Sequence, residues 1–226
     1  MRYFFKGRIE KQENLYCIRL PFNVWEVCRQ REHIPAELII ENKLFACELI
    51  PEDQTGNYKI HLNREDMEGL ETDKVYKLLV HVSGSLIRMN QNSPYSTDNP
   101  IRKIDNIDII IQPVDGTCGQ TVVAMLAGVT IAEVCATMGC REWQATMGRV
   151  ISALNYYGID HSDVIVYTEG EPTTLPRCAV LMEKMGRYCH YLLYFDGKYY
   201  DPNDGILENY DLTKLQGYLE IRIDEE

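Results

Sequence analysis

Over residues 1–82 the chain alternates between apolar and polar positions in short runs, the pattern of half-buried β-strands. In residues 16–22, Tyr16, Ile18 and Leu20 fall on one face of a predicted strand. The other predicted strands cover residues 2–9, 36–50, 57–62 and 74–82, with the second run divided in two at residues 41–43. Many short strands with few helices predict a small β-barrel.

Two short helices are predicted between these strands. Residues 22–30 have Asn23 as an N-cap, and residues 63–70 have Asn63 as an N-cap with Asp66 three positions later. The next stretch, residues 83–104, holds Gly, Pro and many Asn, Ser and Thr residues, which is the composition of a linker.

After Cys118 the apolar positions take a helical spacing. Residues 119–139 predict a largely buried helix broken at Gly128, and residues 142–158 predict a second helix that stops at Gly158. The apolar stripe of the second helix consists of Trp143, Met147, Val150, Ile151 and Leu154. Strands are then predicted over residues 163–168, 177–183, 188–195, 198–202 and 218–223.

Helices followed by an antiparallel sheet form an α+β layout. We therefore predict an α+β protein with a small β-barrel domain over residues 1–82, a linker over residues 83–104 and a second domain over residues 105–226.

The composition is that of an ordinary globular protein, with 226 residues, 45% hydrophobic and 25% charged. The N-terminus carries Arg2, Lys6 and Arg8 and lacks the apolar run of a secretory signal, and no segment is long enough for a membrane span. These features predict a cytoplasmic protein with no membrane partner. The eight cysteines are then expected to be small buried residues rather than disulfides.

No motif for a metal or another cofactor is present in the sequence. There is no Cys-x-x-Cys pair and no His-Glu-x-x-His motif, and the spacing of Cys135 and Cys140 is too wide for a zinc site. We therefore predict that the protein uses no cofactor.

The net charge of −11 is concentrated in one part of the chain. Residues 91–226 hold 10 basic and 20 acidic side chains, a net charge of −10. This charge disfavours nucleic acid as a partner and favours a basic peptide. A solvated acidic surface that only aids solubility is the alternative interpretation.

Cys118 is the candidate nucleophile because it is placed just before a predicted helix. A cysteine is a strong nucleophile as a thiolate, and both a helix N-terminus and a neighbouring imidazolium favour that form. Only His161 and His190 lie in the second half, and His161 is predicted at the entry to a strand, without a carboxylate placed beside it as for His190. The other three histidines, His33, His61 and His81, are assigned structural or surface roles.

His190 is the candidate base because a predicted hairpin brings a carboxylate to it. Asp196-Gly197 predicts a two-residue turn, which would place Leu192 opposite Asp201 and His190 opposite Asn203. Alternation then puts His190 and Asp201 on one face, within side-chain reach along the diagonal. Asn203 is the alternative residue for orienting the imidazole.

Gln112 is the candidate donor to the oxyanion. It precedes Cys118 by six residues, across a loop that can fold back, and its amide could act together with the Cys118 N–H. Such a donor contributes about 2.7–4 kcal/mol to catalysis where it has been measured.

With Gln112, Cys118, His190 and Asp201 in this order, residues 108–226 resemble the papain-like cysteine peptidases. The segments that carry the likeness are "QPVDGTCG", "CHYLLYF" and "YYDPN", and they are most similar to the bacteriocin-processing type that cleaves after a double glycine. Thr117 stands where that type usually has Asp. The first half resembles a small bacterial β-barrel family of unknown function, through "IRLPFNVWEV", "IIENKLFACELIP" and "NYKIHLNREDMEGL".

The resemblance implies a cysteine peptidase that acts on a peptide or protein substrate, basic or glycine-rich at the cleavage site. The same residues would also serve a deamidase or a transglutaminase, since only the acceptor differs. The remaining alternative is a catalytically inactive module that binds peptides, because a fold does not guarantee an activity. Taken singly, each of the four residues is more often structural, and only their combination favours chemistry.

Overall fold

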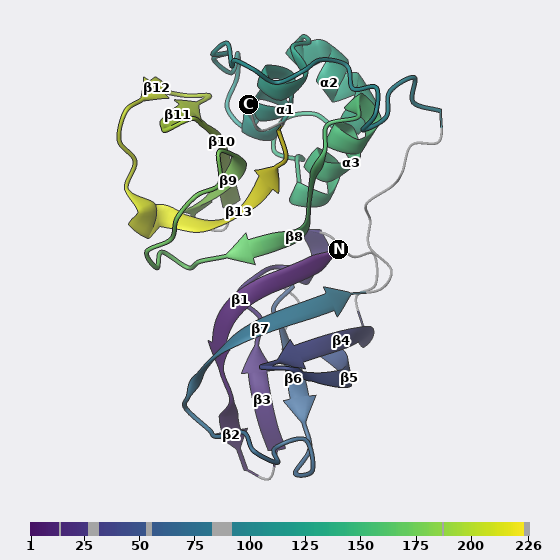
Figure 1. The fold of residues 1–226 in the computed structure, drawn as a ribbon, viewed down its shortest axis with the longest axis vertical. Coiled ribbons are helices and arrows are strands. Elements are labelled where there is room, and N and C mark those ends of the chain that lie inside the picture. The colour runs from purple at the N-terminus through teal and green to yellow at the C-terminus, as the bar shows by residue number, and fades with distance from the viewer. Residues whose placement is uncertain (14, 27–31, 53–55, 83–91, 187, 224–226) are drawn as a thin grey trace. The chain divides into compact units, whose positions relative to one another are not determined.

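The protein has a mixed α+β fold, as predicted, in a computed structural model that describes residues 1–13, 15–26, 32–52, 56–82, 92–186 and 188–223 (Figure 1). Its chain divides into two compact units. One consists of Met1–Leu86 and Asp163–Tyr167, and the other of Ile87–Ser162 and Thr168–Glu226. The first unit therefore includes residues 163–167 from the second half of the sequence. A division of the chain at the predicted linker, residues 83–104, would assign these residues to the second domain.

The first unit is built around one sheet. Its strands are β1 (Arg2–Arg8), β2 (Glu10–Gln12), β3 (Leu15–Arg19), β4 (Ile34–Ile40), β5 (Lys43–Pro51), β6 (Tyr58–Leu62), β7 (Val75–Val82) and the end of β8 (His161–Tyr167). They lie in the order β8-β1-β7-β4-β5-β6-β3-β2, in which β8 runs parallel to β1 and the other described pairs are antiparallel. Strict alternation of buried and exposed residues along β4 confirms the predicted one-sided core.

The described strand pairings do not close this sheet. The strand order within this unit runs from β8 to β2, and no described pairing joins these two strands. The expected closed β-barrel is therefore not found, because β1 pairs with β8 on the side on which a barrel would have to close.

The helix predicted over residues 63–70 is also absent, and turns take its place. The Asn63 side chain accepts hydrogen bonds from the N–H groups of Glu65 and Asp66 at 2.8 and 2.9 Å, so the capping contacts form. No helix follows them, because the segment turns at Gly69, which has a φ of 75°. Of the helix predicted over residues 22–30, the structure describes one 3-10 turn, η1 (Val24–Glu26), and residues 27–31 lie outside the described part.

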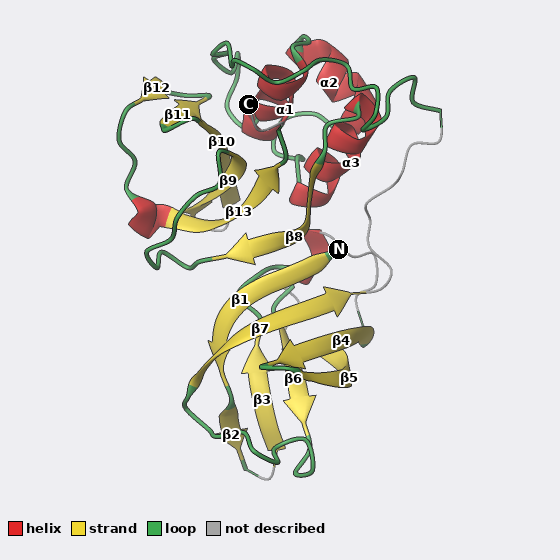
Figure 2. Cartoon of the chain, viewed as in Figure 1, coloured by secondary structure: helices red, strands yellow, loops and turns green. Residues whose placement is uncertain are grey.

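All the described α-helices belong to the second unit (Figure 2). They are α1 (Cys118–Ala127), α2 (Ile131–Met138) and α3 (Met147–Tyr157). Left-handed glycines at 128 and 158 end α1 and α3, which confirms the predicted break and stop. Every residue of α1 is buried, and this helix contacts α2, α3 and β10.

The sheet of the second unit is antiparallel throughout. It consists of β9 (Cys178–Met185), β10 (Tyr188–Phe195), β11 (Lys198–Asp201), β12 (Gly205–Leu207) and β13 (Leu215–Ile221), in the order β12-β11-β10-β9-β13. A 3-10 turn, η2 (Leu212–Lys214), precedes the last strand. Among the described residues no single helix is long and apolar enough to cross a membrane, although α1 and α2, bent by 110°, have the length and composition of a broken span together.

The described part of the predicted linker, residues 92–104, packs on the C-terminal end of α3. Ser93 Oγ donates to the carbonyl oxygen of Tyr156, and the Ile101 N–H donates to that of Tyr157 at 3.0 Å. The Tyr95 ring packs against the rings of Tyr156 and Tyr157. Carbonyl groups at the end of a helix lack partners within the helix, so this segment satisfies two of them.

Gly158 is the position that most depends on this packing. Its φ is 68°, and a Cβ at this residue would lie 2.3 Å from the Ser96 carbonyl oxygen. Gly139 ends α2 in the same left-handed conformation, with a φ of 60°, but a Cβ there would meet no atom within 4 Å.

We expect Gly139→Ala to lower the free energy of unfolding by about 1–2 kcal/mol, the cost of a left-handed alanine. Gly158→Ala should lower it by about 1–3 kcal/mol more, because the packed segment must move as well. Urea denaturation of both variants measures the difference. Equal losses would show that residues 92–104 do not pack on α3 in solution.

Candidate active site

Cys118 is the first residue of α1, and only 8% of it is exposed. The preceding Thr117 does not cap the helix, since its hydroxyl donates to the Val114 carbonyl oxygen at 2.8 Å. In α2 and α3, by contrast, Thr130 and Thr146 accept hydrogen bonds from backbone N–H groups of the first turn. The helix end at Cys118 therefore lacks a side-chain cap, which leaves its partial positive charge to act on the sulfur and on a nearby anion.

The two residues after Cys118 fix this helix end in the core. Gly119 has no room for a side chain, because a Cβ there would lie 2.7 Å from the Ala145 Cβ and 3.2 Å from the Tyr191 ring. Gln120 is fully buried and donates through Nε2 to the Arg141 carbonyl oxygen at 2.8 Å. The Cys-Gly-Gln sequence thus allows the start of α1 to pack closely against β10 and the loop before α3.

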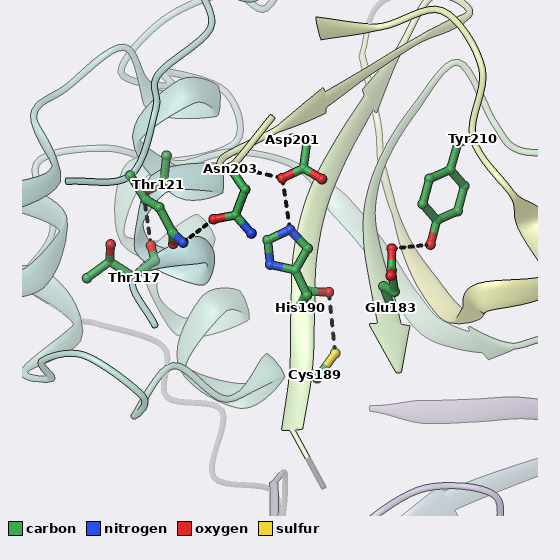
Figure 3. Close-up of polar contacts among 9 residues, drawn as sticks. Thr117, Thr121, Glu183, Cys189, His190, Asp201, Asn203 and Tyr210 are labelled. Carbon is green, nitrogen blue, oxygen red and sulfur yellow. Dashed lines mark hydrogen bonds and ion pairs between the residues drawn. The ribbon is translucent and has the colours of Figure 1, made fainter. Parts of the chain in front are cut away.

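The β10–β11 hairpin has the register that the sequence predicts. Phe195 lies opposite Lys198, and both turn residues, Asp196 and Gly197, have positive φ values of 46° and 87°. As a result His190 reaches Asp201, and His190 Nε2 lies 2.9 Å from Asp201 Oδ1 (Figure 3). The Cys118 side chain also acts on the imidazole and raises its pKa, and Nδ1 is the ring nitrogen that remains for this interaction.

This arrangement holds His190 in its charged form. Burial alone would lower the pKa of the imidazole, but the hydrogen bond to Asp201 and the interactions with the Cys118 and Asp201 side chains outweigh it and raise the pKa to about 10. For Asp201, burial would raise the pKa, whereas the hydrogen bonds from His190 and from the Asn203 N–H, together with the His190 charge, lower it. His190 and Asp201 are therefore an ion pair at neutral pH, with only 6% and 7% exposure.

Gln112 lies beside this pair but not against the sulfur. Its backbone N–H donates to the Pro202 carbonyl oxygen at 2.8 Å, and its side-chain Nε2 donates to Asn203 Oδ1. Among the described residues, no hydrogen bond links the Gln112 amide to Cys118. An amide nitrogen has two hydrogens, so one remains for an oxyanion after the bond to Asn203.

The Asn203 side chain forms its hydrogen bond with a residue other than His190, whose imidazole an orienting residue would contact. Of the two candidates for orienting the imidazole, the structure brings Asp201 to His190, while the Asn203 side chain meets Gln112. The sequence contains no local signal for this contact, since the two residues are 91 positions apart.

The prediction for Trp143 was wrong. This residue is 61% exposed rather than part of a buried helical stripe, because α3 begins only at Met147, after the Thr146 cap. Trp143 has a φ of 60° and its N–H donates to the Gly116 carbonyl oxygen at 2.8 Å. Its ring lies over Gly116 and 5.4 Å from the Tyr188 ring, centroid to centroid.

Comparison with known proteins adds no family to this geometry: no protein-family model and no curated protein sequence matches the chain. In the part of the chain that the structure describes, no group of three or more His, Cys, Asp or Glu side chains could hold a metal ion.

The charged state of His190 can be measured directly. We expect its imidazole signals in an NMR titration to keep the protonated shift through neutral pH and to change near pH 10. Asp201→Asn should bring the midpoint down, because it removes the negative charge beside Nε2. His61 provides an internal contrast, since burial and the charge of Lys59 lower its pKa. A His190 midpoint near 6.5 in the unmodified protein would contradict the ion pair.

Proposed function

We propose that this protein is a thiol-dependent amide hydrolase that cleaves a peptide or protein substrate by acyl transfer through Cys118. The observation that carries the proposal is the position of His190, which is hydrogen-bonded to Asp201 and whose pKa is also raised by Cys118 at the start of a buried helix. A nucleophile, a base and a group that orients the base are the three parts that such chemistry requires. We also propose a papain-like architecture for the second unit, supported by the order of these residues and by a buried helix that packs on an antiparallel sheet.

In the first half of the reaction the Cys118 thiolate attacks the carbonyl carbon of the scissile bond. The carbonyl oxygen becomes an oxyanion, which the Cys118 N–H and the free hydrogen of the Gln112 amide would stabilise. His190 then gives its Nδ1 proton to the departing amine as the C–N bond breaks, leaving a thioester on Cys118.

In the second half a water molecule loses a proton to His190, now neutral, and attacks the thioester carbonyl. The C–S bond breaks, a carboxylic acid product leaves, and the thiolate–imidazolium pair is restored. Asp201 accepts the Nε2–H bond throughout, which keeps the imidazole in one orientation and one tautomer.

The acidic charge of residues 91–226 favours a substrate with basic residues near the cleaved bond, and the resemblance to double-glycine peptidases favours one with glycine there. A primary amide or an amine acceptor would turn the same steps into deamidation or transglutamination. In each case the thioester on Cys118 is the shared intermediate.

The proposal predicts that Cys118 is the most reactive thiol of the protein. Limiting iodoacetamide near pH 6, followed by peptide mass mapping, should modify Cys118 first, since the imidazolium stabilises its thiolate. Cys17 and Cys178 are the controls, because both are fully buried and burial raises the pKa of each thiol, that of Cys178 to about 12. His190→Ala should slow the modification of Cys118 by about tenfold or more, because it removes the imidazolium that favours the thiolate.

Two results would count against the enzyme. One is a Cys118 no more reactive than Cys17 or Cys178, and the other is a Cys118 whose reaction ignores His190→Ala. Together they would leave the second unit as a peptide-binding module without a working nucleophile.

The same assay separates Asp201 from Asn203. Asp201→Ala should slow alkylation of Cys118, because the imidazolium loses the charge that stabilises it. Asn203→Ala should leave alkylation nearly unchanged, since its contact with Asp201 is made by the backbone N–H, at 2.7 Å, and survives the substitution. The reverse order would assign the orienting role to Asn203.

A further inference from the structure

We propose that Asn203 is a positioning residue that turns the Gln112 amide so that its N–H, and not its carbonyl oxygen, faces the oxyanion. This inference rests on the proposed function and adds to it a residue that touches neither the sulfur nor the imidazole in the reaction. It also gives one short loop control over both the oxyanion donor and the orienting carboxylate.

The two ends of the Gln112 amide have different surroundings. Nε2 donates to Asn203 Oδ1, while Oε1 is buried and has no hydrogen-bond partner within the described residues. The Asn203 oxygen is therefore the side-chain group that distinguishes the two ends of the amide, because it can only accept. Without it, the amide could turn by 180° and present an oxygen to the developing negative charge, which would oppose the reaction.

The loop that carries Asn203 is itself held at the site by backbone hydrogen bonds. Its backbone N–H donates to Asp201 Oδ1 at 2.7 Å, the same oxygen that lies 2.9 Å from His190 Nε2. The preceding Pro202 accepts the backbone N–H of Gln112 at 2.8 Å. The loop between β11 and β12 thus binds the Gln112 backbone through Pro202 and its side chain through Asn203, while it fixes the carboxylate through the Asn203 N–H.

Figure 3 makes the geometry visible. The Asn203 side chain lies beside His190, below the Asp201 carboxylate, and its oxygen points away from the imidazole toward its hydrogen-bond donor. Since the Asn203 side chain is exposed, its replacement removes this contact with little effect on the core.

Two reagents that attack the same sulfur separate this role from a general effect on the site. Acylation of Cys118 by p-nitrophenyl acetate passes through an oxyanion and depends on its donors, whereas alkylation by iodoacetamide has no oxyanion. Both rates would be measured on the full chain, by nitrophenolate release and by intact mass, for wild type, Gln112→Ala, Asn203→Leu, Asn203→Asp and the double variant Gln112→Ala/Asn203→Leu.

We expect Gln112→Ala to slow acylation by about 100-fold, the effect of losing one oxyanion donor. Asn203→Leu should slow it by at least tenfold, and the double variant should be no slower than Gln112→Ala, because both substitutions remove the same interaction. Asn203→Asp keeps an acceptor for the Gln112 amide and should retain most of the rate. All four variants should be alkylated within about twofold of the wild-type rate.

Three results would overturn the inference. In the first, Asn203→Leu is acylated at the wild-type rate. In the second, the double variant shows the full product of the two single reductions in acylation rate. In the third, Asn203→Leu slows alkylation as much as acylation. In each of these cases a wild-type Cys118 that is selectively alkylated and depends on His190 leaves the proposed function standing. A wild-type protein that is alkylated in this way but never acylated would overturn both.

Discussion

The register of the β10–β11 hairpin is the constraint on which the candidate site depends. Asp196 and Gly197 both adopt positive φ, and the turn is tied to the residue that precedes β9 by the ion pair of Arg177 and Asp196, with Nε and Oδ1 2.7 Å apart. A slip of one residue would turn Asp201 to the opposite face of the sheet. His190 would then be a buried imidazole without a carboxylate, and the burial that now holds a charged pair would favour the neutral ring.

The site is also coupled to stability through its charges. Because the pKa of His190 is raised in the folded protein, its charge adds to the free energy of unfolding. This stabilisation is complete below about pH 6.5 and is lost as the pH rises through about 10. Because the pKa of Asp201 is lowered in the folded protein, its carboxylate also adds to the free energy of unfolding. This stabilisation is complete above about pH 3.8, the ordinary pKa of an aspartate, and is lost as the pH falls through the lower pKa of the folded state. Between these limits the ion pair stabilises the fold as well as the reactive form of the site, so chemistry and stability do not oppose each other at this pair.

Local signals in the sequence were sufficient for the elements that carry the reacting groups. The Asp-Gly turn, the glycine stops at Gly128 and Gly158 and the position of Cys118 before a buried helix all follow from a few adjacent residues. What the sequence did not reveal depends on contacts between distant segments. The Asn203–Gln112 contact spans 91 positions, and the exposure of Trp143 follows from its place over Gly116 rather than from helical spacing. The open sheet likewise results from β8, which comes some 80 residues after β7.

The position of β8 has a consequence for how the chain is made. β1 leaves the ribosome long before its parallel partner, because residues 163–167 are synthesised only after the three described α-helices of the second unit. During that interval one side of β1 has backbone groups without their final partner, and such an edge can pair with other chains. The first unit therefore stays incomplete until residue 167 has been added, and a ribosome that stalls before residue 163 would leave its sheet with an open edge.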